Sequence, residues 1–276
     1  MASPTSDPLL ATPTSPSASV PEAAPALFDG HADYLLRIAD TPLVLAQRLA
    51  EWVGAAPTLE EEMALANFAL DLLGQATLVL DHAARMYDDG RSADDLAFLR
   101  TDREFTNLLL AELPIGDFAV TIVRQVLYEA WASVWWPALA TSADPQLAGI
   151  AAKAARETSY HLDHSVGWLV RLADGTDESR ARVAAAIELL WPFFGECLLA
   201  DELDQRAAAA GVAPLPSSLA DALLARIADI FAAAQLPVPD DAYWQRGGRQ
   251  GLHTEHLGHL LAEMQVLQRQ HPGAIW

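Results

Sequence analysis

Residues 58–87, TLEEEMALANFALDLLGQATLVLDHAARMY, contain the pattern that decides the fold class. Apolar side chains recur every three or four positions along the whole stretch, which is the spacing of one face of an α-helix. Thr58 is followed three residues later by Glu61, as in a capping box, and the sequence Asp88-Asp-Gly-Arg91 breaks the pattern. The stretch is therefore predicted to form one helix of about eight turns.

The same periodicity continues through most of the chain, and no alternating run of β-branched residues bounded by turn residues interrupts it. Prolines fall near the ends of the segments, except that Pro192 lies inside a predicted helix and should kink or split it. Long helices joined by short turns indicate an all-α, antiparallel long-helix bundle with additional C-terminal helices. Besides the helix over 58–87, helices are predicted over residues 29–53, 117–139, 145–172 and 178–210, with shorter ones in 92–113, 217–234 and 253–269.

The N-terminal segment differs from the rest of the chain. Residues 1–26 are rich in Ala, Pro, Ser and Thr, contain no Lys or Arg, and show no periodicity. They have neither the basic start and apolar middle of a secretory signal nor the arginines of a mitochondrial presequence. We interpret residues 1–26 as a disordered, dispensable extension and residues 27–276 as a single helical domain.

The composition excludes several classes of protein. Hydrophobic residues make up 52% of the 276 positions and charged residues 20%, which excludes a disordered chain. The net charge of −20 argues against nucleic-acid binding, and no uncharged apolar run has the length of a membrane helix. The single cysteine, Cys197, excludes an internal disulfide, so a cytoplasmic location is the simplest expectation. Cys197 itself is expected in the core.

An all-helical bundle can hold two irons between facing helices, in a cage of four acids and two histidines supplied as Glu and Glu-x-x-His. Part of such a set is present on the four long helices. Asp71 is followed at the third position by Gly74 rather than by His, and the position after Glu157 that should hold His holds Tyr160. One histidine is therefore missing and another is displaced by one position. The candidate positions are Glu51, Asp71, Glu129, Glu157 and His161.

These acids have three interpretations. In the first interpretation, they are the remains of a metal cage and now form hydrogen bonds or ion pairs, with Arg48, Arg124 and Arg156 as partners. Alternatively, they bind metal through an atypical ligand set, or they are ordinary solvated or paired acids of amphipathic helices. The incomplete motif favours the first interpretation, a vestigial site.

Two other groups of residues stand out. His253, His256 and His259 recur every three residues without the His-Glu-x-x-His of a zinc protease, so we expect them to line a helix that packs on the bundle or on a partner. Trp131, Trp135 and Trp136 have the spacing of core residues, although tryptophan is also common in protein interfaces. The chain lacks a GxSxG motif, a phosphate loop and a Gly-rich dinucleotide turn, so hydrolysis, ATP use and NAD binding have no support.

Seven segments together resemble one family, the C subunit of the bacterial multicomponent 1,2-phenylacetyl-CoA epoxidase of phenylacetate catabolism. The resemblance covers residues 27–276, so only the N-terminal extension departs from it. The segments are LANFALDLLGQA (65–76), DDLAFLR (94–100), REFTNLLL (103–110), GDFA (116–119), YHLDHS (160–165), HTEHLG (253–258) and LAEMQ (261–265).

The resemblance implies a ferritin-like fold and a structural, non-catalytic role in a monooxygenase complex. The partner would be a homologous catalytic A subunit that carries the di-iron centre and the phenylacetyl-CoA site. A separate reductase with a flavin and an iron–sulfur cluster would deliver electrons from NADPH. No cofactor is expected in this chain, and the tryptophan-rich helix is expected to contribute to the apolar face that meets the partner.

Two alternatives to this role stay open. The chain could be an active di-iron oxygenase subunit with an atypical ligand set, or a stand-alone helical binding protein. Self-association of the chain is also open, because the sequence does not determine whether the chain dimerises.

Overall fold

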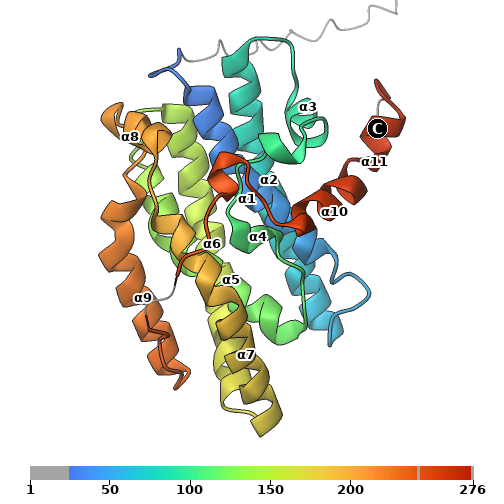
Figure 1. Ribbon diagram of the computed structural model, residues 1–276, viewed down its shortest axis with the longest axis vertical. Coiled ribbons are helices and arrows are strands. Elements are labelled where there is room, and N and C mark those ends of the chain that lie inside the picture. The colour runs from blue at the N-terminus through green and yellow to red at the C-terminus, as the bar shows by residue number, and fades with distance from the viewer. Residues whose placement is uncertain (1–24, 241–242, 275–276) are drawn as a thin grey trace, which may run out of the picture.

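The computed structural model describes residues 25–240 and 243–274, and within these ranges the chain forms eleven α-helices and no strand. Four long helices form the centre: α1 (His31–Ala50), α2 (Leu59–Tyr87), α5 (Phe118–Leu139) and α6 (Pro145–Ala173). α1 packs along α2, α5 packs along α6, and α2 also contacts α6, so two helix hairpins face each other (Figure 1). This arrangement confirms the predicted all-α fold class and is consistent with a ferritin-like bundle.

The remaining helices cover the sides of this centre. α7 (Asp177–Phe194) packs on α5 and α6, and α9 (Ala220–Ala233) packs on α5. Figure 1 shows the C-terminal helices α10 (Glu255–Met264) and α11 (Val266–Gln270) projecting on the side opposite to α9. The shorter helices are α3 (Ala93–Phe98), α4 (Leu109–Glu112) and α8 (Glu202–Ala209). Residues 1–24 of the predicted N-terminal extension lie outside the described residues.

Side-chain caps start three of the four central helices, namely α2, α5 and α6. The carboxylate of Asp117 accepts a hydrogen bond from the backbone N–H of Val120, 3.0 Å away, so α5 begins where the sequence predicts. Thr58 caps α2 by accepting from the N–H of Glu61, 3.3 Å away. The reciprocal half of the predicted capping box is not formed, because the Glu61 carboxylate instead contacts His164 on α6 at 3.0 Å.

Pro42 and Pro192 both lie inside helices. The chain does split near Pro192, but the break lies beyond the proline: α7 continues to Phe194, a 3₁₀ turn follows, and α8 starts at Glu202 with a bend of 48°. Pro42 lies inside α1, contrary to the expectation that prolines other than Pro192 fall near segment ends. Next to it, Thr41 accepts a hydrogen bond from the N–H of Leu108, 3.0 Å away, so this part of α1 is anchored to the 100–108 segment.

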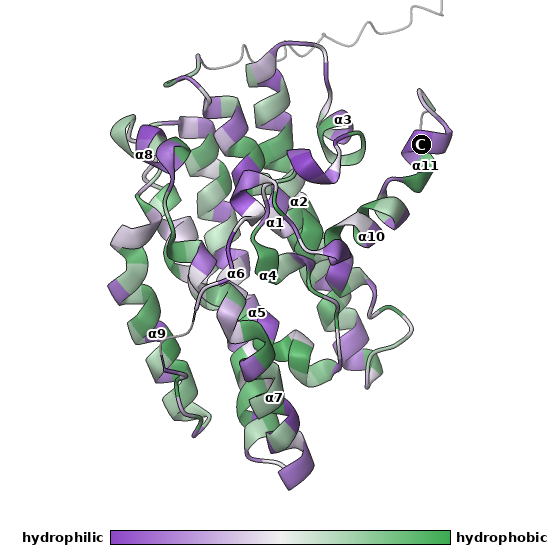
Figure 2. Ribbon diagram, viewed as in Figure 1, coloured by the Kyte–Doolittle hydropathy of each residue, from purple (hydrophilic) through white to green (hydrophobic). Residues whose placement is uncertain are grey.

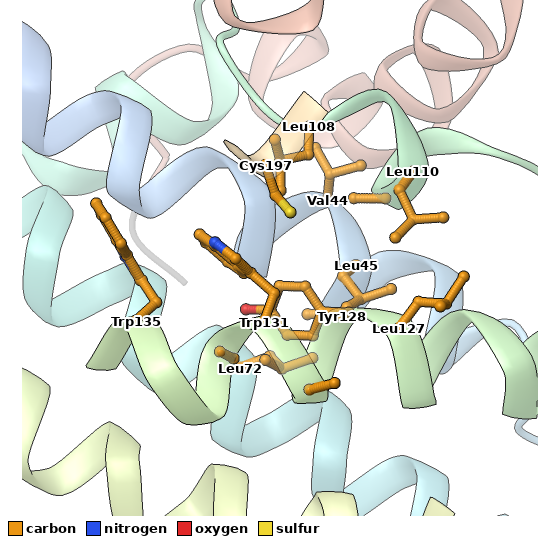
Figure 3. Packing of buried hydrophobic residues seen from close by; sticks show 14 of the residues in the cluster. Val44, Leu45, Leu72, Leu108, Leu110, Leu127, Tyr128, Trp131, Trp135 and Cys197 are labelled. Atoms are coloured by element: carbon orange, nitrogen blue, oxygen red, sulfur yellow. The ribbon is translucent and has the colours of Figure 1, made fainter. Parts of the chain in front are cut away.

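The tryptophans of α5 lie in the core. Trp131, Trp135 and Trp136 are only 6%, 3% and 1% exposed, and the first two stack with ring centroids 5.5 Å apart. Figure 3 shows Trp131 beside Tyr128 and near Cys197. The expectation that this helix presents an apolar face to a partner is therefore corrected, because these side chains are already covered by their own chain.

Cys197 is 2% exposed, which confirms the prediction of a core cysteine, and burial raises the pKa of its thiol to about 12. Within the described residues, α2 is the one unbroken helix whose length and composition would suit a membrane span, and 44% of its most apolar window is buried inside the protein.

Candidate functional site

Three of the five predicted site residues meet at the centre of the bundle. Asp71 on α2, Glu129 on α5 and His161 on α6 come from three different helices. The His161 ring places Nε2 3.1 Å from an oxygen of Asp71 and Nδ1 3.3 Å from Oε1 of Glu129. Glu129 and His161 are fully buried, whereas the Asp71 side chain is 41% exposed. The histidine thus connects a buried carboxylate with one that reaches the surface.

The contacts of His161 determine how this cluster holds protons. A neutral imidazole has one N–H and one lone pair, so it cannot donate to both carboxylates. Burial acts to lower the pKa of His161, but the hydrogen bonds and charges of Glu129 and Asp71 outweigh it and raise this pKa. Burial also raises the pKa of Glu129, against the opposing effect of His161. Both shifts favour the protonated form of the group concerned.

Glutamine side chains occupy the neighbouring positions. The amide of Gln75 donates to Glu157 across 3.0 Å, and Lys153 forms an ion pair with the same carboxylate. The amide of Gln125 lies 3.5 Å from Oε1 of Glu129. The sequence interpretation did not single out either glutamine. Their positions four residues from Asp71 and four residues from Glu129 are the signal that could have identified them.

Glu51 does not join the cluster. It lies at the end of α1, its side chain is 38% exposed, and Nη1 of Arg48 donates to it across 2.7 Å. Of the three arginines expected as partners, Arg48 is the one that pairs with a candidate acid in the described part of the chain. Arg124 is fully buried and donates to the carbonyl oxygens of Leu113 and Pro114, and burial lowers the pKa of its guanidinium to about 9. Arg156 is exposed on α6.

The donor set does not fit two irons. Iron ligands must offer lone pairs, and both nitrogens of His161 face carboxylates while both glutamines direct N–H groups at the acids. The buried oxygens of this set that have no hydrogen-bond partner among the described residues are Oε2 of Glu129 and the side-chain oxygens of Gln75 and Gln125. The set contains one histidine where the di-iron motif needs two. Among residues 25–240 and 243–274, no group of three or more His, Cys, Asp or Glu side chains has an arrangement that could hold a metal ion.

Comparisons with known proteins agree with the resemblance seen in the sequence. The model of the phenylacetic acid catabolic protein family matches residues 20–276. This chain belongs to that family. It is also 49% identical over 243 residues to the C subunit of the 1,2-phenylacetyl-CoA epoxidase of Escherichia coli (strain K12), across 88% of this chain and 98% of the relative.

In this member of the phenylacetic acid catabolic family, the C-terminal histidines do not converge. His253 contacts Glu112 through Nδ1 at 2.7 Å and the carbonyl oxygen of Phe105 through Nε2 at 2.8 Å. His259 is exposed and His256 is partly exposed. His253 lies before α10, which begins at Glu255, and is bound to the last residue of α4 and to the segment before α4, so only His256 and His259 of this run lie on the helix.

A second acid–histidine cluster lies at the end of the bundle near the start of α1. Oδ2 of Asp144 is 2.6 Å from Nε2 of His82 and 3.3 Å from Nε2 of His31. The other oxygen, Oδ1, caps α6 by accepting from the N–H of Gln146, 2.9 Å away. Burial opposes the charged form of Asp144, but the two histidines and the cap hold its pKa far below its usual range. This cluster has a structural role in joining α1, α2 and α6.

Proposed function

We propose that this chain is the C subunit of a phenylacetyl-CoA 1,2-epoxidase, a ring-epoxidising monooxygenase of aerobic phenylacetate catabolism. Its role is that of a non-catalytic structural subunit that stabilises a homologous, di-iron A subunit. The similarity to the Escherichia coli C subunit over nearly its whole length supports the assignment to the complex.

One observation carries the non-catalytic role: His161 bridges Asp71 and Glu129 at 3.1 and 3.3 Å, in the place where facing helices of a di-iron bundle present their ligands. His161 engages Asp71 and Oε1 of Glu129, so the cluster has partners within the same protein without a metal, although Oε2 of Glu129 is buried without a hydrogen-bond partner among the described residues. Oxygen activation then belongs to the A subunit, and NADPH-derived electrons reach it through the flavin and iron–sulfur reductase. A cytoplasmic complex is consistent with this role.

The iron content of the isolated chain tests this proposal. The protein is expressed alone in iron-replete medium, purified without chelator, and its iron is measured per chain. We expect close to none, because the donor set lacks a second histidine and both nitrogens of the first are engaged. Close to two irons per chain would favour the alternative, an active oxygenase subunit with an atypical ligand set.

A further inference from the structure

The outward face of α2 is unusually apolar for a surface helix. Six of its residues follow one another at alternating steps of four and three, the spacing of a helix-packing seam. Three large side chains in this seam are well exposed, with Leu59 at 69%, Met63 at 59% and Leu70 at 65%. The seam, called the α2 seam below, consists of Leu59, Met63, Ala66, Leu70, Leu73 and Thr77.

Charged residues are almost absent from this part of α2. Residues 63–80 include a single charged side chain, Asp71, in a chain whose net charge is −20. The most apolar window of α2 has a mean hydropathy of 1.5, but only 44% of it is buried inside the protein. Figure 2 shows hydrophobic residues along α2 near its label. A surface helix normally turns a polar face to water, so this face has the composition of an interface.

The α2 seam borders a groove that it shares with α1. Gln47, Ala50 and Val53, from α1 and the turn after it, lie opposite Ala66, Leu70 and Leu73, around a space of about 250 Å³. Leu73 also lines a second space of about 160 Å³ that continues toward Phe98 on α3. Among the described residues that line the first space, Gln47 is the only polar one. The groove has the apolar lining that receives the apolar side of another helix.

We propose that the groove between α1 and α2 is the docking surface for a helix of the catalytic A subunit, an inference that rests on the function proposed above. Acidic residues flank the groove at both ends, with Glu60 and the Arg48-paired Glu51 at one end and Asp81 and Asp94 at the other, and all four are exposed. The helix that fits it therefore has an apolar seam in its middle and basic residues at both ends.

The charge of the chain argues for this occupant over two others. A second copy of the chain would bring another net charge of −20 and the same acidic ends to the contact. A membrane surface that contains anionic lipids would repel the same acids. A basic helix of a different subunit instead complements both the centre and the ends of the groove.

A double substitution in the α2 seam tests the docking surface. Met63→Glu with Leu70→Glu places two charges in the α2 seam, the second of them in the lining of the groove. Both positions are more than half exposed, so the fold should persist, as circular dichroism would verify. Co-expressed with a tagged A subunit, this variant should bind with a Kd raised about 100-fold relative to the unmodified chain. The uncharged single variant Leu70→Gln should weaken binding in the same direction.

The matched control is Leu189→Glu with Leu224→Glu, on α7 and α9, where the side chains are 54% and 46% exposed. It adds the same charge far from the groove and should leave the Kd unchanged. Undiminished binding by the α2 variant would overturn the docking surface while leaving the subunit role intact. Failure of the unmodified chain to bind any A subunit would instead refute the proposed function and favour a stand-alone binding protein.

Two further measurements address the other occupants. A dimer of the isolated chain that becomes monomeric in the Met63→Glu, Leu70→Glu variant would assign the groove to a second copy. Flotation of the isolated chain with vesicles of anionic phospholipid, lost in the same variant, would assign it to a membrane. Either result would overturn the proposed occupant.

Discussion

Buried tryptophan side chains fill the space between α5 and its neighbours. Trp135 and Trp136 are 3% and 1% exposed, and Trp131 stacks on Trp135. Large aromatic side chains in such positions contribute to stability through the apolar area they bury and through the close packing around them. These tryptophans therefore contribute to the stability of the chain, and substituting them would affect assembly only through a loss of stability.

Replacing Trp135 or Trp136 by alanine should therefore destabilise the chain. We expect each single substitution to lower the free energy of unfolding by about 3 to 5 kcal/mol, because a large cavity remains in a packed core. Urea unfolding followed by circular dichroism measures the change. Leu189→Ala, at a position 54% exposed, is the control and should change it by less than about 1 kcal/mol. A tryptophan variant that is as stable as this control would contradict the core assignment.

At the scale of elements, one buried carboxylate links the start of α10 to the bundle, in addition to the buried leucines of α10 itself. Glu112 accepts from the N–H of Thr254 at 2.6 Å and contacts Nδ1 of His253 at 2.7 Å. The carbonyl oxygen of Phe105 can only accept, so Nε2 of His253 must carry a proton, and Nδ1 faces a carboxylate. Burial alone would lower the pKa of His253, but the contacts with Glu112 and with the carbonyl oxygen of Phe105 outweigh burial and raise this pKa above its usual value.

This attachment should weaken as the pH rises. A histidine with a raised pKa in the folded state stabilises the protein fully below its unfolded pKa of about 6.5, and the contribution is lost as the pH rises through the folded value. Hydrogen exchange in α10, corrected for the intrinsic rate, should therefore show stronger protection at pH 6 than at pH 9. The variant His253→Gln should lower protection at pH 6 by about 1 to 3 kcal/mol and remove most of this pH dependence. Equal protection of α10 at both pH values in the unmodified chain would show that His253 is not the attachment.

At the scale of the whole molecule, the helical domain has specific contacts at residues 27 and 28. The N–H of Leu27 donates to Nδ1 of His31 at 3.3 Å, and the Phe28 ring stacks on the His31 ring with centroids 5.1 Å apart. Residues 1–24, rich in Ala, Pro, Ser and Thr, lack the apolar periodicity that would bury them. The domain boundary predicted at residue 27 stays a prediction, because residues 1–24 lie outside the described part of the chain.

Deleting residues 1–24 should leave the domain unchanged. The free energy of unfolding should stay within about 0.5 kcal/mol of the full-length value, because the contacts of Leu27 and Phe28 are kept. Thermal unfolding of both chains measures this. Deleting residues 1–28 is the matched comparison and should lower the melting temperature, since both contacts are lost. A clear loss of stability on removing residues 1–24 alone would contradict the interpretation of a dispensable extension.

The amino-acid sequence by itself determined the fold class, most helix ends and the family. The helix over residues 59–87 and the Asp117 cap follow from local rules, namely the 3.6-residue period and the need to satisfy the first N–H groups of a helix. Asp71, Glu129 and His161 were predicted as positions of one site, because acids and a histidine in apolar helices need polar partners, but the partners expected for the acids were arginines rather than His161.

Only the tertiary structure decided which side chains meet and which remain exposed. Glu51 looked equivalent to the other acids, yet it lies at the end of α1, where it pairs with Arg48 and is exposed to solvent. The tryptophans looked suited to an interface but are covered, while Met63 and Leu70 repeat like core residues and are exposed. A helical period shows that a face is apolar, but what covers that face depends on how the helices are arranged around it, and that arrangement is set by contacts between residues distant in the sequence.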